Sequence, residues 1–373
     1  MNLDILVNTI IIILIICAIL IFRNKITLKT IRKLRYPFLI FFITASVLTA
    51  AYYHNIEEAH DIDDAVTAAC RHFIDGTNLY EENIVPRFAE KYHGKDTEIK
   101  YATFNYPPIT LIGYSIPFII LFPIVGNFWF PLFNIILGAI SFIVLSIAFP
   151  RFDKIFIASF IGMLTLFFLF DNIMLTLAFM SVAIYFYFSS PNKYNISFSI
   201  LFVTLAAMVK MIGAITAAIF LLYIIQKNLK NHKVIKQVGI SISAILILAL
   251  ITIAPFGITN ILNSTVYYFS DIDIRSLSSE CGGTLLMTLL LTIGKIQLFP
   301  IIMKITVGMI ILGSLFISEL LPRIFVSEII SSFVMIKASH ALILIPAMTL
   351  FVYIIIKTYT DDSVIKMREE VRK

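Results

Sequence analysis

The sequence predicts an all-α protein that crosses a membrane many times, and three observations support this prediction. Of its 373 residues, 59% are hydrophobic and only 14% are charged, whereas soluble domains contain about 25% charged residues. The mean hydropathy is +0.94. Apolar runs long enough to cross a bilayer as helices, about 17 to 25 residues each, recur along the chain. We therefore expect one integral membrane domain over residues 1–373 with about eleven transmembrane helices.

The expected membrane-spanning segments follow the apolar runs in chain order. The segment 319–338 is different because charged and apolar residues alternate in it. We expect it to lie along the outer membrane surface rather than to cross. The spans are expected at about residues 8–22, 36–52, 107–124, 128–149, 155–170, 172–189, 196–225, 237–256, 283–299, 300–318 and 339–357.

The distribution of lysine and arginine predicts the orientation of the chain. The loop 23–35 carries six of these residues, which is typical of a cytoplasmic loop. Residues 53–106 contain eleven acids against five Lys/Arg, so this long first loop is expected outside the cytoplasm. The first apolar run has positive charge after it and none before it, the reverse of a secretory signal peptide. We expect the N-terminus to be extracytoplasmic.

The later loops extend the same pattern. A lysine-rich loop at 227–236 and the tail 358–373 fall in the cytoplasm, with the C-terminus, while a second loop at 257–282 falls outside. The turn around Asp153 also falls outside. The net charge of +6 is explained by orientation in a cell membrane, so it predicts membrane lipids as partners and no binding of nucleic acid.

The first outer loop contains a predicted amphipathic helix that begins at Asp61. Its apolar residues recur at the spacing of one helical face, and Gly76 is expected to end the helix as a C-cap. On a helical wheel, Asp61 and His72 fall on one flank of this face, Asp63 on the other, and Asp64 points away. The apolar face is formed by Ile62, Ala65, Val66, Ala69 and Phe73.

The acids at the start of this helix are candidates for a general base. A helix on the membrane surface would hold Asp61 or Asp63 at the boundary between water and protein, where burial raises the pKa of a carboxyl group. The alternative is a structural role. Asp61 and Asp64 have the spacing of an N-cap and a third-position acid, which would bind the amides of the first helical turn.

Several short motifs occur in a fixed order along the chain. They are the acidic residue at the start of the loop helix, Gly76-x-Asn78-x-Tyr80, Phe104-x-Tyr106-Pro107-Pro108, Ala206-Ala207-Met208-Val209-Lys210, and Ser339-His340 before Pro346. Together they resemble the polytopic GT-C glycosyltransferases and most closely glycosyltransferase family 87, the polyprenyl-phosphate-mannose-dependent α-mannosyltransferase type. The chain departs from that family at two places: Asp171-Asn172 stands where the family often has a Gln-x-Asn turn, and Ala341 replaces a second histidine after His340.

The resemblance implies a fold and a reaction. A cavity between the first outer loop and the helix bundle would receive a polyprenyl-phosphate sugar, carrying a mannose-like hexose or a pentose. The sugar would pass with inversion to a lipid or glycan acceptor on the extracytoplasmic face. The general base would be Asp61, with Asp63 and Asp64 as alternatives. The branch of the family that the chain resembles is metal-independent, so no cofactor is expected, and a divalent cation is the less favoured alternative.

The departing phosphate needs a cationic partner in a site of low dielectric constant. Lys210 within an expected span and Arg275 in the second outer loop are the candidates, with His340 as a further catalytic group. Each has a structural alternative: Lys210 could extend to the membrane surface, Arg275 could form a surface ion pair, and His340 could be an interfacial residue. The residues expected to bind substrate are Tyr80, Tyr106, His72 and Glu280.

Two other predictions remain open. A disulfide between Cys70 and Cys281 is possible only if both loops lie on the same oxidising side.

A multi-pass secondary transporter or a lipid-carrier flippase is the alternative function. Transporters usually have related halves and broken helices; the sequence has no matching halves, and its acids are concentrated in one outer loop.

Overall fold

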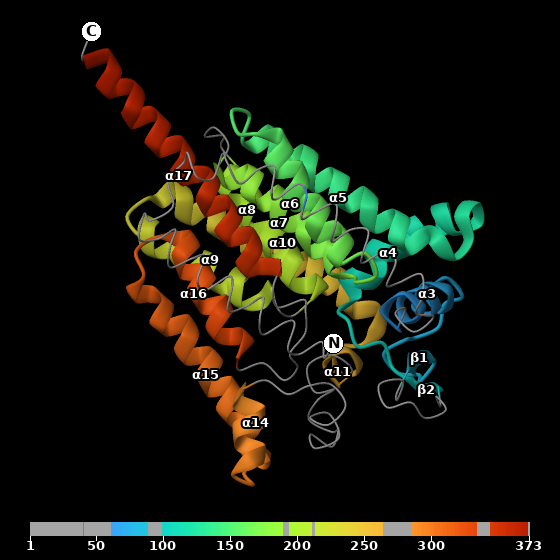
Figure 1. Cartoon of the computed structure of the whole chain (residues 1–373). Coiled ribbons are helices and arrows are strands. Elements are labelled where there is room, and N and C mark those ends of the chain that lie inside the picture. Colours follow the sequence, from blue (N-terminus) through green and yellow to red (C-terminus); the bar gives the residue numbers. More distant parts are fainter. Residues whose placement is uncertain are drawn as a thin grey trace.

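The computed structural model describes residue 40 and residues 61–88, 99–188, 194–210, 213–263, 285–333 and 344–371. Within these residues the fold is helical, as predicted, apart from one antiparallel pair of strands, β1 (Val85–Phe88) and β2 (Ile99–Ala102). This pair lies beside the amphipathic loop helix α3 (Asp61–Ile74) (Figure 1). The expected span 8–22 and almost all of the span 36–52 lie outside the described residues.

Among the described residues, two helical stretches are long and apolar enough to cross a membrane, Pro108–Ala148 and His232–Phe256. The first stretch is two helices, because Gly126 adopts a φ of +59° that favours glycine and turns the chain between them. Tyr114 before the turn then stacks on Phe130 after it. The helices therefore support association with a membrane, while the total of about eleven spans stays a prediction.

The remaining helices form a bundle around a predominantly apolar core (Figure 1). The helices with their bounds are α4 (Pro108–Val125), α5 (Trp129–Ala148), α6 (Lys154–Phe167), α7 (Ile173–Phe188), α8 (Asn195–Val209), α9 (Gly213–Asn228), α10 (His232–Ile253), α11 (Ile258–Ile261), α14 (Leu285–Thr292), α15 (Phe299–Gly313), α16 (Leu320–Ser332) and α17 (Leu344–Val371), with short 3₁₀ turns η2 (Gly126–Phe128), η3 (Ala254–Phe256), η5 (Ile296–Leu298) and η6 (Ser314–Phe316).

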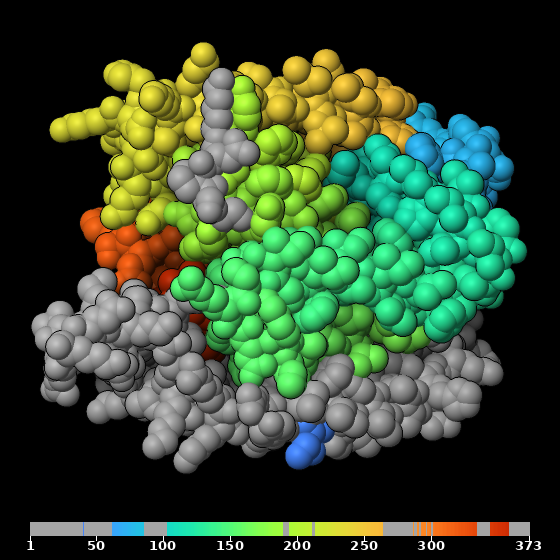
Figure 2. All heavy atoms as spheres, turned by 90° about the horizontal axis from the view of Figure 1, so that it is seen from above, coloured from blue at the N-terminus to red at the C-terminus, as the bar shows by residue number. Residues whose placement is uncertain are grey.

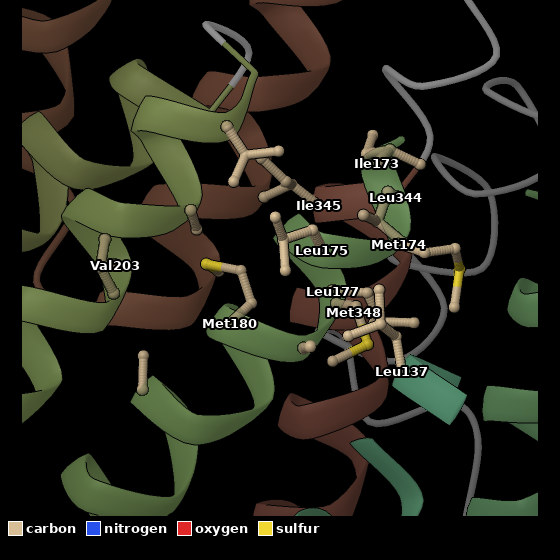
Figure 3. Packing of buried hydrophobic residues seen from close by; sticks show 14 of the residues in the cluster. Leu137, Ile173, Met174, Leu175, Leu177, Met180, Val203, Leu344, Ile345 and Met348 are labelled. Carbon is tan, nitrogen blue, oxygen red and sulfur yellow. The ribbon is translucent and has the colours of Figure 1, made fainter. Parts of the chain in front are cut away.

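Side chains from distant helices fill the core. In Figure 3, Leu344, Ile345 and Met348 of α17 lie near residues of α7 and α5, among them Leu177 and Leu137. Phe351 of α17 stacks on Phe160 of α6 with 3.9 Å between ring centroids. Since α17 follows α6 by nearly two hundred residues in the printed sequence, these contacts join the end of the described chain to its middle.

The outward faces of several helices are also apolar. Ile120 of α4, Ile143 of α5 and Leu250 of α10 are each more than half exposed. Figure 2 shows α4 and α5, in teal and green, side by side across one face of the molecule. Extended apolar surfaces of this kind are rare on soluble monomers and typical of contact with lipid.

The contacts between helices define two ends of the bundle. At one end, the ring of Phe149 after α5 contacts that of Phe188 in α7, and Ser197 of α8 donates a hydrogen bond to the backbone oxygen of Gln237 in α10. We call this the basic end, because it carries four exposed lysines around the α9–α10 turn. At the opposite end, the loop end, the start of α7, the α8–α9 turn and the end of α10 lie near α3. The four lysines are Lys227, Lys230, Lys233 and Lys236.

The turn around Asp153 lies at the basic end together with the loop 227–236, whereas the alternation of expected spans placed the two on opposite sides of the membrane. The reason is helix α4. At its start, the Thr110 hydroxyl bonds to the last residue of α8, and near its end the ring of Phe122 lies 4.8 Å from the Arg71 guanidinium of α3. Helix α4 therefore runs along α3 at the loop end, and it does not carry the chain to the basic end.

Two other expected segments differ from the structure. The span 196–225 is not one helix, because the chain turns back at Lys210, and α8 and α9 pack against each other as a hairpin.

The segment 319–338 does not lie on the surface. Its helix α16 packs between α9 and α17, where Arg323 and Glu328 are 1% and 2% exposed. Both charged side chains find hydrogen-bond partners on α9, which offsets the cost of burying them.

Candidate functional site

The amphipathic helix α3 forms one wall of the site and confirms its predicted pattern. Ala65, Val66 and Ala69 are fully buried, and Ile62 and Phe73 pack against the same core. Gly76, at a φ of +82°, ends the helix as predicted. The amide of Gly76 bonds to the carbonyl of Phe73 and the amide of Thr77 to that of His72, which are the two hydrogen bonds of a Schellman C-cap.

The Gly76-x-Asn78-x-Tyr80 segment attaches the loop to the bundle. The Asn78 amide bonds to the carbonyl of Phe256 at the end of α10, and its side-chain oxygen accepts from the amide of Tyr80. The buried hydroxyl of Tyr80 donates to the carbonyl of Tyr106 at 2.8 Å. This links the second and third motifs of the predicted family pattern, and it gives Tyr80 a structural role as well as a place beside the site.

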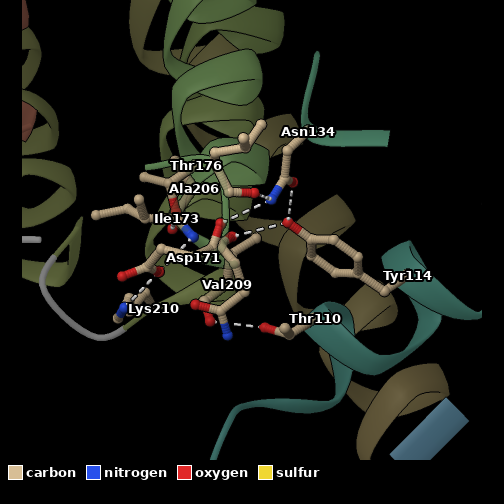
Figure 4. Close-up of polar contacts among 11 residues, drawn as sticks. Thr110, Tyr114, Asn134, Asp171, Ile173, Thr176, Ala206, Val209 and Lys210 are labelled. Atoms are coloured by element: carbon tan, nitrogen blue, oxygen red, sulfur yellow. Dashed lines mark hydrogen bonds and ion pairs between the residues drawn. The ribbon is translucent and has the colours of Figure 1, made fainter. Parts of the chain in front are cut away.

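The fourth motif, Ala206–Lys210, meets these two at Lys210. The Lys210 ammonium lies 5.9 Å from the centre of the Tyr106 ring, and Thr110 donates to the carbonyl of Val209 at 2.6 Å. Tyr106 and Thr110 flank the paired prolines, and α4 starts at Pro108 as the sequence predicted. The Phe104–Pro108 segment and the Ala206–Lys210 segment, a hundred residues apart, are therefore neighbours, and Figure 4 shows Thr110 beside Val209 and Lys210.

Lys210 forms an ion pair with Asp171. The ammonium lies 2.8 Å from Oδ1 of Asp171, and the two side chains are 18% and 3% exposed. The same oxygen accepts a hydrogen bond from the amide of Ile173 and so caps the start of α7. Asp171 thus holds the lysine at the α8–α9 turn.

A buried hydrogen-bond network fixes the position of the Asp171 turn. The Tyr114 hydroxyl donates to Oδ1 of Asn134 at 2.9 Å. The amide of Asn134 in turn donates to the carbonyls of Leu169 and Asp171. Both side chains are fully buried, so this network is shielded from water. It joins α4 and α5 to the turn that carries the ion pair (Figure 4).

Asp63 is the acid of α3 with the environment of a general base. Its side chain is 8% exposed, and Oδ1 accepts a hydrogen bond from the Thr67 hydroxyl at 3.3 Å. Burial, together with the neighbouring charge of Asp64, raises the pKa of Asp63 to about 7, and the Thr67 hydrogen bond opposes the rise. The charges of Asp171 and, more weakly, Asp63 both act on the buried hydroxyl of Tyr114.

The other predicted site residues are distributed as follows. Asp64 is exposed, as the helical wheel indicated, and His72 is partly buried. Asp61 starts α3, but its side chain lies outside the described part of the structure, so its capping role stays a prediction. Three further residues lie outside the described ranges, namely Arg275, Glu280 and His340.

Cys70 is a free thiol, so the possible disulfide with Cys281 is not formed. The Cys70 side chain is buried and within 3.6 Å of the Ser115 hydroxyl on α4. Burial raises the pKa of the thiol to about 12, which keeps it protonated and unreactive at neutral pH. In the described residues no group of three or more His, Cys, Asp or Glu side chains gathers as a metal site, and metal independence stays a prediction.

Sequence reasoning missed two features of this site. Asp171 was considered only as a weak motif match, although an aspartate just before a predicted helix signals an N-cap and a buried lysine needs an acidic partner. Trp129, whose indole donates to Thr67, was not considered. No local pattern could have found it, because the contact joins residues on α5 and α3.

Comparison of the chain with protein-family models, with curated proteins and with solved structures finds no match in any of the three. The geometry of the loop end is therefore the basis for an argument about function, and the resemblance to glycosyltransferase family 87 stays a prediction.

Proposed function

We propose that the chain is a multi-pass membrane glycosyltransferase that moves a sugar from a polyprenyl phosphate to a lipid or glycan hydroxyl. The observation that carries the proposal is the meeting of three distant segments at the loop end of an apolar bundle. The segments Gly76–Tyr80, Phe104–Pro108 and Ala206–Lys210 come together at the Lys210–Asp171 ion pair, and helix α3, which carries the buried Asp63, packs on α4 at the same end of the bundle. A large soluble sugar nucleotide is a poor match for a site in such apolar surroundings.

Asp63 is the proposed general base. A carboxyl group with a pKa of about 7 is about half ionised at neutral pH and is still a useful proton acceptor. It removes the proton of the acceptor hydroxyl while the oxygen attacks the anomeric carbon from the face opposite the phosphate. The new carbon–oxygen bond forms as the bond to the phosphate oxygen breaks. The configuration of the sugar is therefore inverted. This assignment moves the general base from Asp61 to Asp63, one of its two expected alternatives.

Lys210 is the proposed partner of the phosphate. Its ammonium has three N–H donors and Asp171 is bound by one of them at 2.8 Å, while 18% of the side chain is exposed. Asp171 keeps the lysine charged and fixed in position, so the cation is preorganised for an anion. As negative charge grows on the departing polyprenyl phosphate, this fixed cation stabilises it. The Tyr106 ring, 5.9 Å from the same ammonium, is the proposed surface on which the sugar ring stacks.

The test is sugar transfer by the purified protein in lipid vesicles, with radiolabelled mannosyl phosphoryl polyprenol and a polyprenol-linked or glycolipid acceptor. We expect Asp63→Asn to lower the rate by about 10²- to 10⁴-fold, the usual contribution of a general base. Asp64→Asn is the matched control, because Asp64 is an exposed neighbour on the same helix, and it should remain active. Full activity of Asp63→Asn together with loss in Asp61→Asn would return the base to Asp61.

A secondary transporter is the second candidate, and one observation favours it. Transporters place their binding sites at broken helices that carry charged residues, and the chain turns back at Lys210 beside Asp171. Uptake of a free solute into proteoliposomes, without sugar transfer and without dependence on Asp63, would favour this function instead.

A further inference from the structure

Three side chains form a hydrogen-bonded series that ends at Asp63. The indole Nε1 of Trp129 donates to Oγ1 of Thr67 at 3.0 Å, and the Thr67 hydroxyl donates to Oδ1 of Asp63 at 3.3 Å. Trp129 is fully buried at the start of α5, whereas Thr67 and Asp63 lie one turn apart on α3. The series therefore connects the helix bundle to the acid in the loop.

The chemistry of the three groups fixes the direction of the hydrogen bonds. An indole N–H can only donate, and a hydroxyl group has a single proton. When Thr67 accepts from Trp129, its own proton remains available for a carboxylate, which can only accept. The hydroxyl is thus oriented toward Asp63 by a donor that cannot reverse its role.

Trp129 is itself held firmly. Its ring makes edge-to-face contacts with Tyr114 at 6.3 Å and with Phe118 at 5.1 Å between centroids, both on α4. A rigid aromatic donor of this kind restricts the position of the hydroxyl that it binds. Because α3 also packs on α4, the same contacts fix the helix that carries the acid.

We propose that Thr67 and Trp129 are positioning residues that orient the Asp63 carboxylate for proton removal and favour its ionised form. The proposal deepens the proposed function, since it rests on Asp63 as the base. The hydrogen bonds themselves do not depend on which substrate the site takes. The Trp129–Thr67–Asp63 series, which we call the relay, can therefore be tested separately from sugar transfer.

Other charged and titratable groups lie near Asp63 and bear on its ionisation. On α3 itself, Asp64 opposes ionisation of Asp63, and the buried thiol of Cys70 stays neutral. From α4, the Tyr114 hydroxyl lies within electrostatic range. Arg71, also on α3, is directed toward the ring of Phe122. Among the described side chains, Thr67 is the group whose hydrogen bond lowers the pKa of Asp63.

The chain contains a single tryptophan, so intrinsic fluorescence reports on this relay directly. We expect the emission of the full-length protein in detergent to change with pH with a midpoint near 7, the value set by burial of Asp63. The change should vanish in Asp63→Asn, which removes the carboxyl group and preserves its size. An emission that is constant from about pH 5 to 9, or a change that persists in Asp63→Asn, would overturn the proposal.

Thr67→Val removes the hydroxyl group and keeps the shape of the side chain. We expect the pH-dependent change in emission to lose most of its amplitude, because the hydroxyl group that joins Trp129 to Asp63 is gone. The same loss should raise the pKa of Asp63 by about one unit, because a hydrogen bond to a charged acceptor is removed. Thr67→Ser retains a hydroxyl and should keep both the amplitude and a midpoint near 7. A Thr67→Val protein with the wild-type change in emission would show that the hydroxyl does not connect Asp63 to Trp129.

Enzyme rates separate the relay from the function. The base must be ionised. At pH 6 the rate of sugar transfer by Thr67→Val should therefore be about ten-fold lower than that of the wild type, and above pH 8 the two rates should become similar. Trp129→Phe should shift the pH profile in the same direction. If fluorescence follows Asp63 and Thr67 as expected but no variant or wild-type protein transfers sugar, the proposed function fails and the relay stands. If transfer occurs with a pH profile that Thr67→Val does not shift, the relay fails and the function stands.

Discussion

At the scale of single residues, the cost of burying charge decides where the polar groups of this chain lie. The ionised side chains that the bundle takes in are paired or hydrogen-bonded: Asp171 bonds both Lys210 and the first turn of α7. Asp63 near the loop is buried and accepts a hydrogen bond from the Thr67 hydroxyl, and its pKa is raised to about 7. A paired charge serves binding and placement, whereas a carboxyl group left close to neutrality serves proton transfer.

The ion pair makes a prediction about stability. Lys210→Met leaves the carboxylate of Asp171 buried without its cation, so we expect the free energy of unfolding to fall by about 3 kcal/mol. The double variant Lys210→Met with Asp171→Asn should recover to within about 1 kcal/mol of the wild type, because asparagine still caps α7 and carries no charge. Both variants should lack sugar transfer.

Thermal unfolding in detergent measures these differences. Lys304→Met is the matched control, since Lys304 is an exposed lysine of the apolar helix α15 and its removal should leave both stability and transfer unchanged. A single variant Lys210→Met as stable as the wild type would mean that the pair contributes nothing to the fold.

At the scale of elements, local patterns predicted what local forces determine. The apolar spacing in α3, its end at Gly76 and the start of α4 at the paired prolines are each set by neighbours within one or two turns. The break at Lys210 is not encoded in this way. The run 196–225 stays apolar through the turn, and the hairpin forms because Gly213 lets α9 approach the backbone of Ala207, where a Cβ would lie 2.9 Å away.

Close helix contacts give a second prediction. A Cβ added at Gly138 of α5 would clash with Oγ1 of Thr165 on α6. We therefore expect Gly138→Ala to lower the free energy of unfolding by about 1 to 3 kcal/mol through overpacking. Adding Thr165→Ala should restore most of the loss, because it removes the clashing hydroxyl and methyl groups.

The matched control is Gly239→Ala on α10, where nothing lies within 4 Å of the added Cβ. This variant should be neutral or gain up to about 1 kcal/mol from the better helix propensity of alanine. Unfolding in detergent compares the three proteins. Equal stability of Gly138→Ala and Gly239→Ala would contradict close contact between α5 and α6.

At the scale of the whole molecule, the composition predicted a helical protein associated with a membrane. It could not predict which apolar runs pass from one end of the helix bundle to the other. The expected alternation counted α4 as a crossing and α8–α9 as one span. In the structure α4 runs along α3, and α8 and α9 fold back on each other. Each deviation reverses the side of every later loop, so the two cancel after residue 228. The lysines at 227–236 therefore lie at the end opposite the first outer loop, as the alternation of spans expected. The turns at 126–128, 149–153 and 168–172 lie at the opposite ends from those expected.

This correction predicts which residues share a side of the membrane. Starting from protein with Cys17, Cys70 and Cys281 replaced by alanine, single cysteines are introduced at Lys230, Arg151 and Glu82, all of which are exposed. We expect Arg151→Cys and Lys230→Cys to react with a membrane-impermeant maleimide from the same side, because the ring contact of Phe149 with Phe188 places both turns at the basic end. Glu82→Cys, in the loop beside α3, should react only from the other side.

Intact cells and inside-out vesicles supply the two sides for this labelling. With the lysine-rich end in the cytoplasm, labelling at 151 and 230 appears only in vesicles and labelling at 82 only in cells. Labelling of Arg151→Cys together with Glu82→Cys would restore the original alternation, and it would require α4 to cross the membrane. The same outcome would separate Thr110 from the turn that carries Lys210, and the proposed site at the loop end could not then assemble.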